Sequence, residues 1–357
     1  MAFGHALALA GALLLQPEQC EFIVLGMLEP TSELLQLVNQ YRQGVRDEPI
    51  AKLADVDQDE LRLFRDRVLR VRDMAAPGPR RTAEPDDLCL KAASLLETEL
   101  AMSLAVRSRW EDADSHFEEA WQISFLIEAP LDRLRFQRDW LLASGLFNHQ
   151  LIFVNLAEEA FTRADRFLHN AVRLYPNDLE VLLAAGSLLE WSGSLRGGDP
   201  SHLKQAEELY SRARRLAATE PEILLRHGLV LEKLEKEDEA APPLRRVLEL
   251  DARKDLIYRS RMVLGRMAER AGRLAEAIAH YEAAADAIPS WQVAYVALGH
   301  ALHDSGSHDR ARGMLDRALA MDMKSADETL GGWWSYELGI ALRFEPLLER
   351  MRAEVTK

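Results

Sequence analysis

The segment AGRLAEAIAHYEAAADAIP, Ala271 to Pro289, carries far more small residues than a buried helix of Leu and Ile would. Within it, Ala277 and Ala284 lie seven residues apart on either side of the bulky Tyr281. Residues seven apart share one face of a helix, because seven residues make nearly two turns. Small side chains on such a face predict that a neighbouring backbone comes very close. The same arrangement should therefore recur along the chain.

A glycine followed by a small–bulky–small triplet does recur. Twelve residues after Gly228, Gly265 and Gly299 stands an alanine, then Leu or Tyr four residues on, then Val or Ala three residues beyond. The three triplets are Ala240, Leu244 and Val247; Ala277, Tyr281 and Ala284; and Ala311, Leu315 and Ala318. After Gly186 a similar triplet, Ala206, Tyr210 and Ala213, is delayed by an insertion, and Gly339 marks the start of a last unit.

These five glycines are 42, 37, 34 and 40 residues apart, which gives a basic period near 34 with longer loops in some units. The pattern resembles the tetratricopeptide repeat, a pair of antiparallel helices that stacks on its neighbours. The resemblance implies an all-α, right-handed α-solenoid of stacked antiparallel helix pairs. The glycine and the first alanine are expected where the two helices of a pair cross, with the bulky residue as the knob between small ones.

The repeat pattern divides the chain into regions. Clear repeats are predicted over 179–331, degenerate repeats over 88–178, and a half-repeat with a capping helix over 332–357. Residues 75–87, AAPGPRRTAEPDD, predict a linker because three prolines and a glycine interrupt helical periodicity. Residues 1–74 are interpreted as an N-terminal helical segment or cap.

Composition favours a folded helical protein, with 48% hydrophobic and 29% charged residues. The net charge of −14 argues against binding along nucleic acid, because no stretch concentrates enough Lys and Arg. Cys20 and Cys89 form neither a CxxC pair nor a disulfide framework, so they do not decide the redox compartment.

The first twenty residues leave two interpretations open. An apolar run from His5 to Leu15 has the length of a signal-peptide core, but it lacks a preceding Lys or Arg and a following cleavage site. A buried first helix is the alternative. The protein is expected in the cytoplasm on that alternative, and exported to the periplasm if residues 1–20 are a signal. No other segment of the sequence is predicted to span a membrane.

Three histidines form the best candidate for a metal site. His300 and His303 share a helix face, and His308 follows across a turn. Three imidazoles with neighbouring aspartates are ligands that zinc accepts. The competing interpretation is a solvated turn with two histidines facing the groove, and it is preferred, so no metal, cofactor or catalytic residue is predicted.

The resemblance implies that the first helix of each pair lines a concave groove. Counting from each glycine assigns to this groove Arg226, Arg259, Met262, Arg266, Arg270, His300 and His303. The Lys and Asn with which chaperone-binding members of the family hold a peptide carboxylate are missing there. Instead a basic and apolar strip is predicted, suited to a protein or peptide of acidic character. Alternatively, these arginines pair with Glu232, Glu269 or Glu276 of the chain itself.

The C-terminal aromatic residues also leave two interpretations. Trp333 to Gly339 should open one more first helix at the end of the stack. Trp333 and Trp334 then form the core of a C-terminal cap, or else an aromatic contact at the end of the groove.

We predict a non-catalytic scaffold that binds a protein or peptide in its groove. The alternative is a metal-binding module or metal-dependent enzyme centred on His300, His303 and His308.

Overall fold

The computed structural model describes residues 87–106, 108–155, 158–195, 198–321, 331–341 and 343–355. The predicted cap at 1–74, the candidate signal at 1–20 and the linker up to residue 86 lie outside the described residues. Every described element is a helix, and none of the described helices is long and apolar enough to cross a membrane. The prediction of an all-α fold is therefore confirmed for the described part of the chain.

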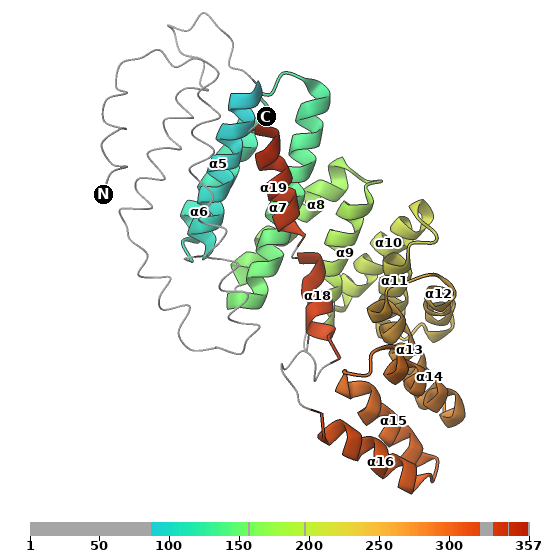
Figure 1. Ribbon diagram of the computed structural model, residues 1–357. Coiled ribbons are helices and arrows are strands. Elements are labelled where there is room, and N and C mark those ends of the chain that lie inside the picture. The colour runs from blue at the N-terminus through green and yellow to red at the C-terminus, as the bar shows by residue number, and fades with distance from the viewer. Residues whose placement is uncertain are drawn as a thin grey trace, which may run out of the picture. The chain divides into compact units, whose positions relative to one another are not determined.

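Fourteen described helices follow one another along the chain (Figure 1). They are α5 (Asp87–Val106), α6 (Trp110–Ser124), α7 (Pro130–Asn155), α8 (Glu158–Leu174), α9 (Leu179–Ser194), α10 (Pro200–Leu216), α11 (Pro221–Lys233), α12 (Glu237–Glu249), α13 (Lys254–Arg270), α14 (Leu274–Ala287), α15 (Gln292–Asp304), α16 (His308–Leu319), α18 (Trp333–Ala341) and α19 (Phe344–Val355). They divide into two compact units, described separately below.

The first unit contains α5, α6, α7 as far as Trp140, and α19 from Glu345 onward. Helices α5 and α6 form an antiparallel pair, and a small–bulky–small triplet of the same kind, Ala113, Phe117 and Ala120, is buried in it. The ring of Phe117 meets that of Trp140 edge-on at 6.4 Å. Two ion pairs hold α19 in this unit: Arg350 to Asp139 at 3.0 Å and Arg352 to Glu99 at 2.7 Å.

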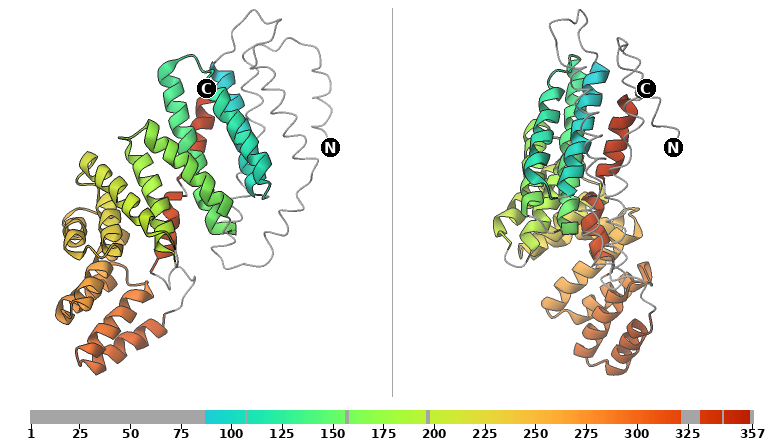
Figure 2. Two further views of the ribbon diagram at one scale, coloured as in Figure 1. Left: turned by 180° about the vertical axis from the view of Figure 1, so that it is seen from behind. Right: turned by 90° about the vertical axis from the view of Figure 1, so that its left-hand side faces the viewer.

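The second unit runs from Leu141 to Phe344 among the described residues and contains the clear repeats. Helices α9 and α10, α11 and α12, α13 and α14, and α15 and α16 pair in sequence order, and each pair packs on the next (Figures 1 and 2). This arrangement is an α-solenoid of tetratricopeptide type, as the repeat pattern predicted.

The close approach inferred from the small residues is present in every pair. A methyl group on Gly265 would lie 2.5 Å from Cε1 of Tyr281, and one on Gly186 equally close to Cε1 of Tyr210. Such distances are well below ordinary contact, so the bulky knob packs directly on the glycine. The same contact joins Gly228 to Leu244, Gly299 to Leu315, and Gly145 to Leu168. The last pair extends the pattern upstream into α7 and α8.

One predicted knob differs from the others. Leu315 was expected to be buried like Tyr281, yet it is 42% exposed. Its helix α16 packs on α15, whereas the knobs of earlier pairs are enclosed by the following pair as well. Among the described helices no further pair packs on α16, because α18 lies beside α9.

Candidate functional site: the inner face and helix α18

The first helices of successive pairs, α9, α11, α13 and α15, present a common surface that we call the inner face. Helix α18 lies beside α9 and reaches side chains of α11 and α13 on this face (Figures 1 and 2). The repeat pattern predicted that the helix beginning at Trp333 would continue the stack after α16. Instead this helix, α18, lies beside α9 and covers Arg226 and Arg259, two of the predicted groove residues.

Arg226 of α11 is completely buried under α18. Its Nη2 donates to the backbone oxygen of Tyr336 at 3.4 Å, and its guanidinium carbon stands 4.4 Å from the centre of the Tyr336 ring. On the opposite side it meets carboxylates of Glu190 at 3.5 Å and Glu222 at 3.4 Å. Arg226 therefore links carboxylates of two first helices, α9 and α11, to α18.

Arg259 of α13 has the same role one pair further along. Its side chain is 2% exposed, and its Nη2 donates to the backbone oxygen of Gly332 at 2.5 Å. The guanidinium also lies 5.1, 5.4 and 4.5 Å from the ring centres of Trp291, Trp333 and Tyr336, respectively. A cation among three aromatic faces is held by their quadrupoles as well as by the hydrogen bond.

Two glycines make this approach sterically feasible. Gly331 and Gly332 both have left-handed backbone angles, with φ of 63° and 66°. A methyl group on Gly331 would lie 2.8 Å from the Tyr258 hydroxyl, and one on Gly332 would lie 2.6 Å from Cζ2 of Trp291. Only glycine adopts such angles without cost and leaves room for both neighbours.

Charge pairs beneath α18 are satisfied among themselves. Glu190, fully buried, accepts from Lys233 at 2.9 Å and from the Tyr210 hydroxyl at 2.9 Å. Burial alone would raise the pKa of Glu190, but Lys233 and Arg226 together lower it, so the carboxylate is ionised. Burial likewise opposes ionisation of Glu222, and nearby Arg226 and Arg343 lower its pKa. Arg343 also contacts Glu222 directly, at 2.8 Å.

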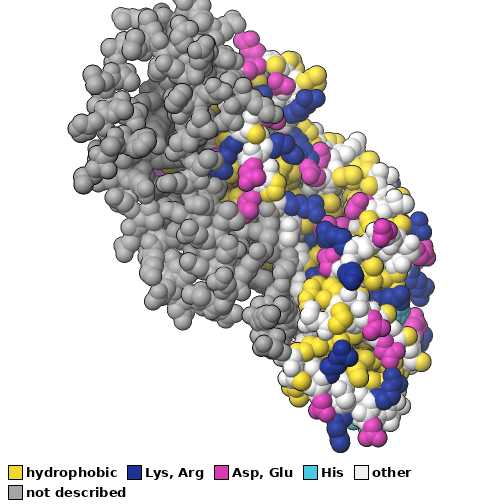
Figure 3. Space-filling view, in the orientation of Figure 1, with side chains coloured by type: hydrophobic (Ala, Val, Ile, Leu, Met, Phe, Trp, Pro, Cys, Tyr) yellow, Lys and Arg dark blue, Asp and Glu magenta, His cyan; other side chains and the backbone are white. Residues whose placement is uncertain are grey.

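The exposed end of the inner face carries a second cluster. Arg266 and Arg270, whose side chains are 48% and 46% exposed, both bind the buried carboxylate of Glu232, at 2.8 and 2.6 Å. Arg270 also reaches Glu237 at 2.9 Å. On the described part of the surface in Figure 3, basic and acidic side chains alternate. The arginines of the predicted basic strip are thus largely paired within the chain. For Arg266 and Arg270 the partner is Glu232, one of the carboxylates that the alternative interpretation named.

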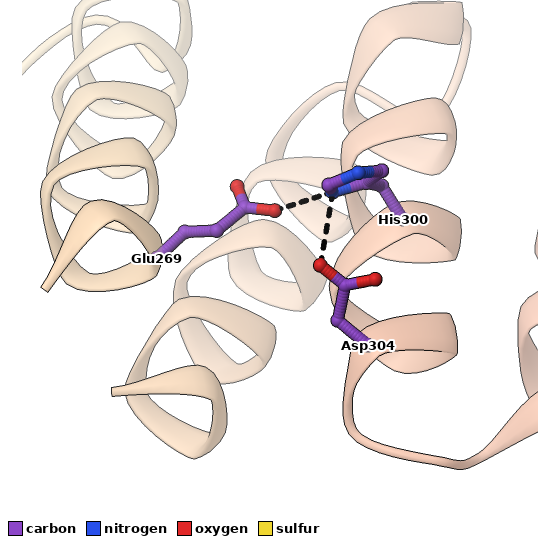
Figure 4. Close-up of side chains that lie close together, drawn as sticks. All are labelled: Glu269, His300 and Asp304. Carbon is purple, nitrogen blue, oxygen red and sulfur yellow. Dashed lines mark hydrogen bonds and ion pairs between the residues drawn. The ribbon is translucent and has the colours of Figure 1, made fainter. Parts of the chain in front are cut away.

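The three histidines do not converge. His300 Nδ1 lies 2.6 Å from Oε1 of Glu269 and 3.9 Å from Oδ2 of Asp304 (Figure 4). His303 and His308 form a separate pair, with their Nδ1 atoms 3.2 Å apart. The predicted cluster of His300, His303 and His308 is therefore divided into two.

Among the described residues, only Glu269, His300 and Asp304 bring three metal-type donor atoms within 4.8 Å of one another. The hydrogen bond that His300 donates to the Glu269 carboxylate raises the pKa of His300, which favours the imidazolium. A metal requires the neutral imidazole, and Glu269 also accepts from the Tyr281 hydroxyl at 2.7 Å. The group is better suited to an ion pair between α13 and α15, and a metal centre is not favoured.

The remaining predicted residues differ in their surroundings. Met262 is buried, 8% exposed, in an apolar cluster with Tyr258 and Tyr295. Sequence reasoning did not find Glu222 or the turn at Gly331 and Gly332. The double glycine directly before two tryptophans was the one available signal for that turn.

No protein-family model matches this sequence, and no curated protein matches it. Two solved structures have similar helix arrangements. One is MamA, and the other is PilF of Pseudomonas aeruginosa. MamA is 24% identical over 45% of this chain and 87% of its own, with a TM-score of 0.39. PilF is 17% identical over 61% of this chain and 92% of its own, with a TM-score of 0.44.

Proposed function

We propose that the protein is a non-catalytic scaffold that holds a helical segment of a partner protein on its inner face. The observation that supports this function is that the inner face already binds one helix, α18, through Arg226 and Arg259. A surface that binds a helix of its own chain has the shape and the hydrogen-bond donors that binding a partner helix requires.

At the exposed end of this face, we propose that Arg266 and Arg270 receive an acidic side chain of the partner. Each guanidinium carries five N–H donors, and Glu232 and Glu237 use only some of them. Both side chains are about half exposed, so their outer donors are accessible. His300 and His303 on α15 extend the same surface, and both are exposed.

Affinity capture with the full chain as bait tests this function. Capture of a partner that binds wild type should fall at least about tenfold with Arg266→Glu, because a carboxylate in place of the cation repels the acidic side chain; tenfold corresponds to about 1.4 kcal/mol. The matched control is Arg310→Glu on α16, which reverses an exposed arginine that pairs with Glu282 instead.

Circular dichroism should show equal helicity for both variants. Capture that persists with Arg266→Glu would remove the exposed end of the inner face from the binding surface. Capture lost equally with Arg310→Glu would show that overall charge, and not this site, governs binding.

A further inference from the structure

The surface that α18 covers combines an apolar cluster, to which Tyr336 belongs with Leu225 and Leu256, with several charged groups, which are unusual beneath a packed helix. Ser187, Glu190, Glu222, Arg226 and Arg259 are all buried there. Buried charges need partners, and apolar side chains are the common solution beneath a permanent helix. Here Arg226 pairs with Glu190 and Glu222, all from first helices, so these charges remain paired without α18. The charged part of the covered surface around Arg226 is therefore compatible with water.

The contacts to α18 have the composition of a protein–protein interface. Arginine and large aromatic side chains dominate such interfaces, and here Arg226 and Arg259 meet Trp333 and Tyr336. Along α18 the side chains that face inward come from Trp333, Tyr336 and Ile340, the spacing of one helix face. This pattern is also how a helix is recognised in a groove.

Helix α18 does not fill its site completely. A pocket of about 300 Å³, open to solvent, remains beside it, lined by residues that include Arg253, Asp255, Tyr336, Gly339 and Arg343. The buried hydroxyl of Tyr336 has no hydrogen-bond partner within the described part of the chain. The unmet buried hydroxyl weakens the closed arrangement, and the open pocket leaves one side of α18 unpacked.

We propose that α18 is an intramolecular occupant of a docking face, and that a partner helix displaces it. The partner is a helical segment with aromatic residues at positions i and i+3 and an apolar residue at i+7, the chemistry that Trp333, Tyr336 and Ile340 present. This inference rests on the proposed function and names its partner class. Displacement transfers Arg226 and Arg259 from the carbonyls and rings of α18 to those of the incoming helix.

A synthetic peptide of residues 331–343, labelled with a fluorophore, tests the displacement. The opened variant combines Gly332→Ala, which clashes with Trp291 and strains the turn, with Tyr336→Ala, which removes the central ring. We expect this variant to bind the peptide at least about tenfold more tightly than wild type, because a closed site lowers apparent affinity in proportion to its population. Adding Arg259→Met should cancel the gain.

Two matched controls sharpen the result. Gly313→Ala, on α16, changes a glycine with nothing near it and should bind the peptide as wild type does. A peptide carrying Trp333→Leu and Tyr336→Leu should bind the opened variant at least about tenfold more weakly, because it lacks the rings for Arg259. Equal peptide binding by wild type and the opened variant, or none by the opened variant, would overturn the proposal.

Hydrogen exchange on the wild-type chain gives a second measurement that does not depend on the variants folding. Amides of α18 should exchange at least about 100-fold faster than those of α11, because α18 opens locally while the pairs stay formed. Equal protection of α18 and α11 would make α18 a permanent part of the fold and end the proposal. Neither measurement uses a partner, so their failure is distinct from unchanged capture by Arg266→Glu, which concerns the proposed function.

Discussion

Substituting Gly265 by alanine tests the packing on which every helix pair depends. The added methyl group would lie 2.5 Å from Cε1 and 2.8 Å from Cδ1 of Tyr281. The Tyr281 ring is 2% exposed, and its hydroxyl is bound to Glu269 at 2.7 Å, so the ring cannot swing aside easily. Relief of the clash therefore requires α13 and α14 to move apart.

The change in the free energy of unfolding that we expect for Gly265→Ala follows from two opposing effects. Alanine is better than glycine inside a helix by about 1 kcal/mol. Overpacking a tight core costs about 1–3 kcal/mol. We expect Gly265→Ala to lower the free energy of unfolding by up to about 2 kcal/mol, which is the overpacking cost less the gain in helix propensity.

Two other glycines supply matched controls for this series. Gly313 in α16 has nothing within 4 Å of an added methyl group, so Gly313→Ala should stabilise by up to about 1 kcal/mol. The stability of Gly299→Ala should lie between those of Gly265→Ala and Gly313→Ala. The atom nearest to the added methyl group, on Leu315, is 3.0 Å away, and that side chain can move because it is 42% exposed. The difference between Gly265→Ala and Gly313→Ala isolates the clash.

Urea denaturation followed by far-ultraviolet circular dichroism measures the series as midpoints at a common slope. The expected order of stability is Gly313→Ala, then Gly299→Ala, then Gly265→Ala. A Gly265→Ala protein that unfolds at the same urea concentration as Gly313→Ala, or higher, would refute the close approach of the two helices.

Three further predictions follow from buried and strained groups. Burial, with Arg226 nearby, lowers the pKa of His149 from 6.5 to about 3. The folded state therefore keeps this ring neutral while the unfolded chain takes up a proton, so stability is full above pH 6.5 and falls between pH 6.5 and 3. Between pH 7.5 and pH 5 the loss is about 2 kcal/mol, and urea titrations of His149→Leu should lack that part of the pH dependence. Glu235, with φ of 60°, ends α11 where Gly272 and Gly306 end α13 and α15. Glu235→Gly should raise the thermal midpoint, because glycine adopts the left-handed backbone without the strain of about 1 kcal/mol that Glu235 adds to the folded state. An unchanged midpoint would mean that the left-handed turn carries no strain there. Tyr336→Phe removes a buried hydroxyl that has no hydrogen-bond partner among the described residues, and it should slow exchange of α18 amides several-fold, which corresponds to about 1 kcal/mol in the free energy of opening; faster exchange would show that the hydroxyl is bonded.

The helix pairs were predictable because their contacts repeat. Gly228, Gly265 and Gly299 stand at one distance from their knobs, and a periodic pattern reports a local packing rule. The position of the predicted groove residues on first helices followed from the same period. Arg226 lies on α11, and Arg259 and Arg266 lie on α13, which are both first helices of their pairs.

The position of α18 could not be predicted, because no period governs a contact between residues far apart in sequence. Arg226 meets Tyr336, 110 residues later, through a chain reversal that occurs once. The same holds for the histidines: spacing placed His300 and His303 on one face, but Glu269 of the preceding pair decides where His300 points. Spacing within a helix cannot report such neighbours.

A double-mutant cycle between Arg259 and Tyr336 tests most directly whether the inner face holds α18. Arg259→Met and Tyr336→Leu retain much of the side-chain volume while removing the cation and the ring, which stand 4.5 Å apart. From urea midpoints of the four proteins, we predict a coupling free energy of about 1–2 kcal/mol, typical of a desolvated cation over an aromatic ring. A coupling of zero, with the two single effects simply adding, would mean that α13 and α18 do not touch.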